Sequence, residues 1–297
     1  MSEKFRGVFA NIPTPFDDSG DALDVSRLNV LIDFLMNRGI HGVACLLSSG
    51  EYPYLNLDER KAFLRHVVDR VAGRAPVLVG VTSLTTRDAI ELATDAERAG
   101  ASAAMVMPLQ YWPIRKDELV AHFTQISQAT SLPLGIYDNP HLGAANFTVD
   151  IYKELVEVAN VQLSKDSSTI LTRVAEVNSA CGDAFSILHG NHLEMLPAYL
   201  LGAAGVCNAI ASVIPEVCIE LYELGAVNRQ WDKALARFRE VFPIFKFFQE
   251  NSLARCVKEA SEMMGRPLGP QRRPLTGLAE PQRVALRAML KDYGYVD

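Results

Sequence analysis

Short apolar runs alternate along the chain with longer stretches in which apolar residues recur every three or four positions. One such stretch places Leu28, Leu31 and Leu35 on a single face, which predicts an amphipathic helix. Near-continuous apolar runs between such helices are typical of parallel strands that are buried on both faces of a sheet. Eight runs fit this description: 7–12, 43–47, 76–81, 103–107, 133–137, 161–164, 185–188 and 204–207.

Eight strand-plus-helix units predict an α/β fold of the closed (β/α)8 TIM barrel type, for which about 250 residues are typical. An open, doubly wound sheet is the alternative, and it would usually carry a glycine-rich dinucleotide fingerprint after its first strand. The sequence at that place, residues 11–16, is Asn-Ile-Pro-Thr-Pro-Phe. We therefore expect the barrel.

The pattern after the eighth unit is mainly helical. We expect residues 1–212 to form the barrel core, and residues 213–297 to form the last barrel helix plus a C-terminal helical extension, packed as one unit. The aromatic stretch 238–248 is expected to kink or to begin a new helix at Pro243. Within the barrel, Thr86 is expected to cap a helix over 87–98 that ends at Gly100.

Charge and cysteine content narrow the classes of partner. The chain has 35 acidic and 29 basic residues and a formal net charge of -6, so we expect neither nucleic acid nor an anionic membrane as a partner. Neither a transmembrane run of about 18 apolar residues nor a signal-peptide core is present, so no membrane span is expected. The five cysteines are scattered without a C-x-x-C pair, which predicts reduced thiols in a cytoplasmic protein and no metal site.

Side chains at the carboxyl ends of the strands are the expected catalytic groups, because the active sites of such barrels lie there. Lys165 stands where the sixth apolar run stops. An amine held away from water loses its proton more easily, and a neutral amine is a nucleophile toward ketones. Tyr137 ends the fifth run, and Ser48, Ser49 and Gly50 follow the second. Taken singly, each has an ordinary alternative: a lysine reaching solvent, a core aromatic, and a simple turn.

Six short motifs occur in order along nearly the whole chain. They are T-P-F at 14–16, S-S-G-E at 48–51, R-x-P-V-x-x-G at 74–80, Y-D-N-P at 137–140, K-D-S-S at 165–168 and L-x-G-A-x-G-V at 200–206. Together they resemble the motifs of the dihydrodipicolinate synthase / N-acetylneuraminate lyase family of pyruvate-handling class I aldolases. That family usually has T-T-G-E or S-T-G-E as the second motif and Y-N-x-P as the fourth. Six motifs in this order, on strand ends, make the resemblance specific.

The resemblance implies a role for each residue. Lys165 would form a Schiff base with the 2-oxo group of pyruvate or of a pyruvate-bearing substrate, with no other cofactor. Tyr137 would relay protons, while Ser48 and Ser49 would bind the substrate carboxylate and link the relay. Tyr111 is the best match to a family tyrosine that reaches into the adjacent subunit's site, so a homotetramer, a dimer of dimers, is expected. The other substrate-binding positions are Gly50, Gly190 and Cys207, the last through its backbone.

The sequence departs from known branches of the family at two sites. The synthases carry an arginine for the second substrate's carboxylate where this chain has Leu142, and the sialic acid lyases carry an acidic pair where it has Asn191 and His192. We therefore expect a Schiff-base-forming lyase (aldolase, synthase or dehydratase) acting on pyruvate or a 2-oxo acid through Lys165, with a different second-substrate pocket. The alternatives are dihydrodipicolinate synthase proper, which condenses pyruvate with an aspartate semialdehyde, and a non-catalytic 2-oxo-acid-binding relative.

Overall fold

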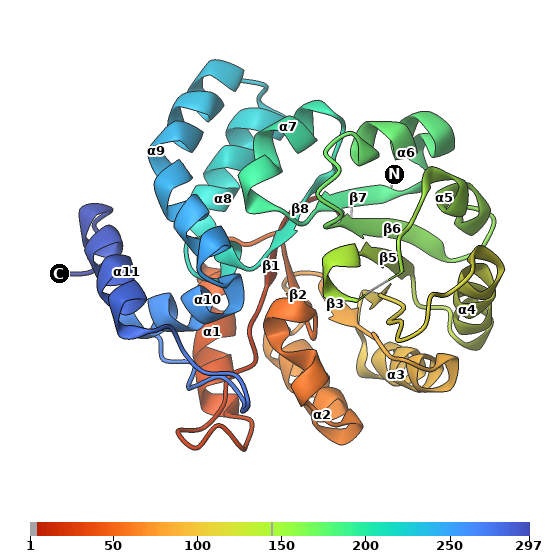
Figure 1. Ribbon diagram of the computed structural model, residues 1–297, viewed down its shortest axis with the longest axis horizontal. Helices are drawn as coiled ribbons and strands as arrows, with labels where there is room; N and C mark the ends of the chain where they lie inside the picture. Colours follow the sequence, from red (N-terminus) through yellow and green to blue (C-terminus); the bar gives the residue numbers. More distant parts are fainter. Residues whose placement is uncertain (1–4, 144) are drawn as a thin grey trace.

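Eight parallel strands form a closed barrel in the order in which they occur along the chain, with β8 hydrogen-bonded to β1 (Figure 1). The structure is a computed structural model that describes residues 5–143 and 145–297. The prediction of a TIM barrel is confirmed. The strands are β1 (Gly7–Asn11), β2 (Gly42–Cys45), β3 (Val77–Gly80), β4 (Ala103–Val106), β5 (Leu134–Asp138), β6 (Val161–Asp166), β7 (Ser186–His189) and β8 (Gly205–Asn208).

A helix follows each strand and covers the outside of the barrel. The first three of these helices begin at capping side chains, and Asn56, at the start of the second, forms a capping box with Glu59. The expected cap Thr86 was wrong by one residue, because the hydroxyl that accepts from the Asp88 amide belongs to Thr85. The eight are α1 (Val25–Asn37), α2 (Leu57–Val71), α3 (Thr86–Ala99), α4 (Lys116–Ala129), α5 (Val149–Leu155), α6 (Arg173–Cys181), α7 (Met195–Leu200) and α8 (Pro215–Tyr222).

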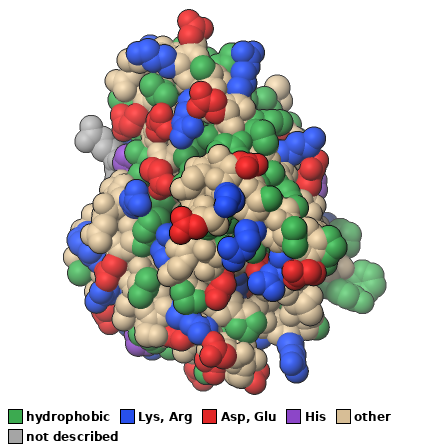
Figure 2. Space-filling view, turned by 90° about the vertical axis from the view of Figure 1, so that its left-hand side faces the viewer, with side chains coloured by type: hydrophobic (Ala, Val, Ile, Leu, Met, Phe, Trp, Pro, Cys, Tyr) green, Lys and Arg blue, Asp and Glu red, His purple; other side chains and the backbone are tan. Residues whose placement is uncertain are grey.

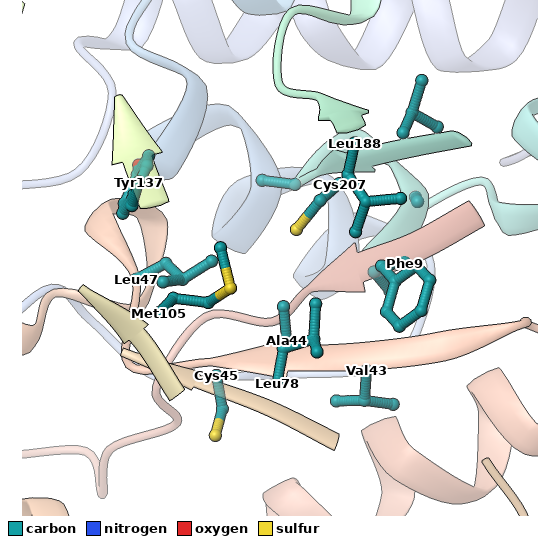
Figure 3. Close-up of a cluster of buried hydrophobic side chains, with 14 of the residues drawn as sticks. Phe9, Val43, Ala44, Cys45, Leu47, Leu78, Met105, Tyr137, Leu188 and Cys207 are labelled. Carbon is teal, nitrogen blue, oxygen red and sulfur yellow. The ribbon is translucent and has the colours of Figure 1, made fainter. Parts of the chain in front are cut away.

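The barrel interior is filled by apolar side chains from most of its strands. Figure 3 shows Phe9, Met105 and Leu188 in this cluster, together with Tyr137 and Cys207 from the cavity end. Close packing also explains why β8 begins with glycine at its junction with β1. A Cβ on Gly205 would lie 2.0 Å from the carbonyl oxygen of Gly7, so a larger residue would push the two strands apart.

Three further helices, α9 (Trp231–Glu250), α10 (Leu253–Met263) and α11 (Glu280–Asp292), gather on one side of the barrel (Figure 1). Figure 2 shows acidic and basic side chains interspersed with apolar ones over the face that these helices form. The helix α9 continues through Pro243, so of the two outcomes expected there, a kink or a new helix, the new helix was wrong. Packing of Val241, Ile244 and Phe245 into the core compensates for the backbone hydrogen bond that proline cannot make.

The extension is joined to the strand ends as well as to the barrel wall. The buried ring of His192, just after β7, donates from Nε2 to the carbonyl of Phe245 in α9, at 2.9 Å. Burial lowers the pKa of His192 to about 4, so the ring is neutral at physiological pH. Within the described residues, every helix is too short or too polar to cross a membrane.

Candidate active site

A cavity of about 590 Å³ opens at the carboxyl ends of the strands. This is the end at which TIM-barrel enzymes carry their active sites. Its wall combines hydroxyl, amide, imidazole and amine groups with a few apolar side chains. The lining residues are Asn11, Ser48, Ser49, Tyr137, Asn139, His141, Leu142, Lys165, Ser167, Thr169, Gly190, Asn191, His192, Cys207, Asn208, Ala209, Gln249, Leu253 and Ala254.

Lys165 and Tyr137 lie side by side because their strands are paired in register. Tyr137 of β5 is the direct partner of Lys165 of β6, so both side chains point to the same face of the barrel wall. The Lys165 side chain is only 4% exposed, and its Nζ lies 3.9 Å from the centre of the Tyr137 ring. The amine is thus held against an aromatic face and away from bulk water, within the cavity.

The Tyr137 hydroxyl connects the amine to the turn after β2. Its oxygen lies 2.6 Å from Oγ of Ser48, in a hydrogen bond that either group can donate. Asn139 Nδ2 donates to the same phenol oxygen at 3.1 Å. Because Asn139 supplies a donor, the phenol proton is free to point toward Ser48. The geometry therefore provides a short path along which a proton can move between two hydroxyls beside the amine.

The remaining predicted substrate-binding positions lie at different distances from the cavity. Ser49, Gly190 and Cys207 line it, whereas Gly50 is buried and is not part of its lining. A larger residue at position 190 would be crowded, because a Cβ there would lie 1.9 Å from Oγ of Ser167 and 3.0 Å from the backbone carbonyl oxygen of Asp166. Burial raises the pKa of Cys207 to about 11, although nearby Lys165 partly opposes this, so the thiol stays protonated at neutral pH.

Tyr111 is not brought to this cavity by its own chain. It lies on the loop after β4, where its side chain is 85% exposed and makes an edge contact with the ring of Trp112, at 5.4 Å between centroids. The cavity wall among the described residues does not include it. Its predicted role in a neighbouring subunit's site stays a prediction.

Several lining residues were not among the predicted site residues. Asn139 directly follows β5 and Asn208 is the last residue of β8, so the barrel rule alone was sufficient to find them. Gln249, Leu253 and Ala254 come from α9 and α10 of the extension. Their sequence carries no signal of the site, because only tertiary packing brings these helices over the strand ends.

Behind the cavity, a row of ionisable groups crosses three adjacent strands. Asp138, Asp166 and His189 are register partners on β5, β6 and β7, and all three are buried. His189 lies 3.7 Å from Asp166 through Nδ1 and 3.0 Å from Glu194 through Nε2. Arg173 approaches Asp138 at 3.9 Å. These side chains point outward from the barrel, on the face opposite to Lys165 and Tyr137.

The two aspartates of this row differ in their surroundings. Burial and the neighbouring Asp166 raise the pKa of Asp138 to about 7, with Arg173 opposing the shift. Burial also acts against ionisation of Asp166, but the nearby imidazole of His189 and the hydrogen bonds from Ser168 outweigh it and lower its pKa. Burial would lower the pKa of His189, yet Asp166 and Glu194 together raise it. Asp166 is therefore the more readily ionised of the two aspartates, whereas Asp138 lies close to its titration point at neutral pH.

The comparisons with known proteins agree over nearly the whole length. A family model, that of the Dihydrodipicolinate synthetase family, matches residues 4–293. The 4-hydroxy-tetrahydrodipicolinate synthase of Caldicellulosiruptor saccharolyticus is 32% identical over 292 residues, which cover 98% of this chain and 97% of that protein.

Solved structures show the same likeness in three dimensions. Dihydrodipicolinate synthase from Aquifex aeolicus gives a TM-score of 0.93 at 28% identity, covering 98% of this chain and 99% of the other. The chloride-inhibited dihydrodipicolinate synthase of Acinetobacter baumannii, solved in complex with pyruvate, gives a TM-score of 0.93 at 26% identity, covering 98% of this chain and 100% of the other. The likeness therefore includes both the barrel and the helices that follow it.

Proposed function

This chain belongs to the dihydrodipicolinate synthetase family, and we propose that Lys165 forms an imine with the 2-oxo group of pyruvate or of a pyruvate-bearing substrate. The chain is a lyase of this family. The observation that carries the proposal is the placement of Lys165 Nζ, buried in the cavity wall 3.9 Å from the Tyr137 ring. The Acinetobacter baumannii synthase, which shares the fold, is described in complex with pyruvate.

The first step is formation of the imine. The neutral amine of Lys165 attacks the ketone carbon, a C–N bond forms, and the carbonyl oxygen leaves as water after accepting protons. Tyr137 gives a proton to that oxygen and recovers one through Ser48, whose Oγ lies 2.6 Å away. The protonated imine then accepts an electron pair, so a bond beta to the imine carbon can break or form. We propose that no other cofactor takes part.

The substrate carboxylate is placed at the turn after β2. Ser48 and Ser49 line the cavity there, and their hydroxyls and neighbouring backbone N–H groups can donate to a carboxylate. Hydrogen bonds to an ionised acceptor are roughly twice as strong as neutral ones. A carboxylate at this turn leaves the ketone carbon facing Lys165 and the ketone oxygen facing Tyr137.

The other half of the substrate meets a cavity wall that, among the described residues, contains no arginine and no lysine other than Lys165. This wall includes the amides of Asn191 and Gln249, the Thr169 hydroxyl with the His141 imidazole 3.0 Å from it, and the side chain of Leu142, which is 50% exposed. We propose a second moiety that carries hydroxyl or carbonyl oxygens rather than a second carboxylate, as in a 2-oxo-3-deoxy sugar acid. The named relatives favour the alternative, a synthase that condenses pyruvate with an aspartate semialdehyde. Product formation from each substrate class, measured side by side, separates the two.

Borohydride reduction in the presence of pyruvate tests the proposal as a whole. The wild-type protein is expected to gain the mass of one reduced pyruvyl group per chain, and the Lys165→Ala variant is expected to gain none. If pyruvate protects the wild-type protein against heat but borohydride traps no adduct, the protein binds 2-oxo acids without forming an imine.

We also propose that the protein acts as a homotetramer in the cytoplasm, on a small-molecule substrate. The exposed pair Tyr111 and Trp112, 85% and 78% exposed, supports a contact between subunits because large aromatic groups are enriched in interfaces. The five cysteines are free, as suits a reducing compartment. Light scattering tests the assembly: a monomer would contradict the sharing of Tyr111 between subunits.

A further inference from the structure

The turn that presents Ser48 and Ser49 to the cavity has a costly backbone conformation at both ends. It is flanked by Leu46 at φ 56° and Glu51 at φ 55°, both of which are buried. Residues with a Cβ rarely adopt this left-handed conformation and persist in it only where their surroundings fix them. The question is therefore which contacts hold the turn Ser48–Gly50 in place.

Glu51, the last residue of the S-S-G-E motif, is joined to the C-terminal extension by a buried ion pair. Its Oε1 lies 2.6 Å from Nζ of Lys258 in α10, and the two side chains are 2% and 3% exposed. Its Oε2 accepts from the backbone N–H of Arg272 at 3.0 Å. Lys258 also donates to the carbonyl of Pro270 at 2.9 Å. A charge pair this deeply buried is tolerated only when such additional hydrogen bonds satisfy it.

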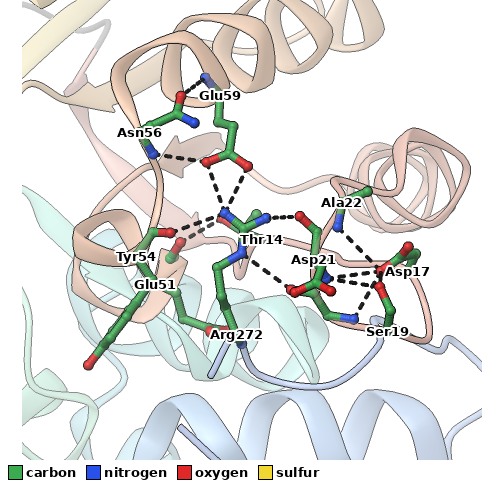
Figure 4. Close-up of polar contacts among 12 residues, drawn as sticks. Thr14, Asp17, Ser19, Asp21, Ala22, Glu51, Tyr54, Asn56, Glu59 and Arg272 are labelled. Carbon is green, nitrogen blue, oxygen red and sulfur yellow. Dashed lines mark hydrogen bonds and ion pairs between the residues drawn. The ribbon is translucent and has the colours of Figure 1, made fainter. Parts of the chain in front are cut away.

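Arg272 extends this connection to the start of α2 and to the loop after β1. Its Nη1 donates to both carboxylate oxygens of Glu59, at 2.8 and 2.9 Å, and to the carbonyl of Tyr54, at 3.1 Å. Its Nε donates to the carbonyl of Gly20 at 3.2 Å. Figure 4 shows Arg272 at the centre of these contacts, with Glu51 and Thr14 beside it.

The T-P-F motif contacts both the C-terminal extension and the serine turn. The ring of Phe16 contacts both cations, with Lys258 Nζ and Arg272 Cζ each 4.5 Å from its centre. Oγ1 of Thr14 donates to the carbonyl of Gly50 at 2.6 Å, inside the turn itself. The T-P-F motif and Glu51, which have no part in the imine chemistry, thus lie between the serine turn and the C-terminal segment.

We propose that Glu51 and Lys258 are positioning residues, whose buried ion pair fixes the serine turn against α10 and so sets where the substrate carboxylate and the Tyr137 hydroxyl are held. The same helix contributes Leu253 and Ala254 to the cavity wall. One element therefore both closes the cavity and fixes its carboxylate-binding turn. The inference rests on the proposed function, because it concerns how that site holds pyruvate.

The test uses the double variant Glu51→Gln/Lys258→Met, which removes both charges while keeping similar side-chain volumes. Replacing both members of a buried pair avoids leaving an unpaired charge, so the double variant is expected to fold with a Tm close to that of the wild type. The measured quantities are the pyruvate concentration for half-maximal borohydride trapping, the maximal trapping rate and Tm. We expect the half-maximal concentration to rise about tenfold, as for loss of one hydrogen bond to a charged group, with a smaller change in maximal rate.

Arg283→Met is the matched control, because it removes an ion pair to Glu259 of α10, at 3.0 Å, that does not involve the turn. Its half-maximal pyruvate concentration should equal that of the wild type. If the double variant folds and its half-maximal pyruvate concentration equals that of the wild type, the ion pair has only a structural role and the inference is overturned. If the double variant does not fold, Lys258→Arg, which keeps the charge but displaces it, is measured instead, and an unchanged concentration overturns the inference equally. If the wild-type protein traps no pyruvate, that result contradicts the proposed function and, with it, this inference.

Discussion

Asp138 carries a carboxylate into the barrel wall behind the cavity, and replacing it with asparagine is expected to stabilise the protein above neutral pH. The side chain is fully buried, and its nearest cation, Arg173, is 3.9 Å away. Its register partner on β6, Asp166, is also a buried carboxylate. Burial and this neighbour raise the pKa of Asp138 from an ordinary 3.8 to about 7.

The size of the effect follows from the difference in pKa between the folded and unfolded chain. Between about pH 4 and pH 7 the folded protein binds the proton more tightly, so the free energy of unfolding falls as the pH rises through this window. A shift from 3.8 to about 7 is about three units, and at about 1.4 kcal/mol per unit the loss is about 4 kcal/mol above pH 7. Asparagine keeps the shape without titrating, so Asp138→Asn should recover much of this loss.

Urea unfolding of the wild type and Asp138→Asn on both sides of the window measures the effect. The two proteins should be similar in stability at low pH, and the variant should be the more stable at high pH. Asp69→Asn, which changes an exposed carboxylate on α2, is the matched control and should leave the pH dependence unchanged. The reasoning fails if Asp138→Asn loses stability with rising pH as steeply as the wild type does.

Three further outcomes test the site. Tyr137→Phe should lower the maximal turnover by about 10²–10⁴-fold, the usual worth of a positioned acid–base group, while pyruvate still binds; an unchanged rate would remove the relay. Gly190→Ala should weaken binding and destabilise the fold by about 1–3 kcal/mol, because its Cβ would overlap Ser167, and calorimetry with a pyruvate titration checks both. Mixing inactive Tyr111→Ala and Lys165→Ala chains should restore activity in mixed oligomers if Tyr111 completes a partner's site, and no recovery would place Tyr111 outside the chemistry.

The barrel could be predicted from sequence because its determinants are local. Apolar periodicity distinguishes the buried strands from the amphipathic helices, and the barrel rule then places Lys165 and Tyr137 at the same end. Apolar periodicity does not show which residues of neighbouring strands are paired. The pairing of Tyr137 with Lys165 depends on the register between β5 and β6, two separate strands. Asp138 shows the limit: its neighbour Asp166 is apparent only when β5 and β6 are aligned.

The contribution of the extension could not be predicted for the same reason. An amphipathic pattern in α10 indicates that one face is buried, but it does not identify the surface against which that face packs. The pairing of Lys258 with Glu51 spans most of the chain, and Leu253 reaches the cavity only because α10 packs over the serine turn. At Pro243 no new helix begins, since burial on both sides of the proline maintains a single helix.

The most direct test of the account is to locate the trapped pyruvyl group within the chain. The protein is incubated with pyruvate, reduced with borohydride, digested, and its peptides are sequenced by mass spectrometry. The account predicts a single modified residue, Lys165, in the peptide that contains the K-D-S-S motif. An adduct on another lysine, including the buried Lys258, with Lys165 unmodified would contradict it.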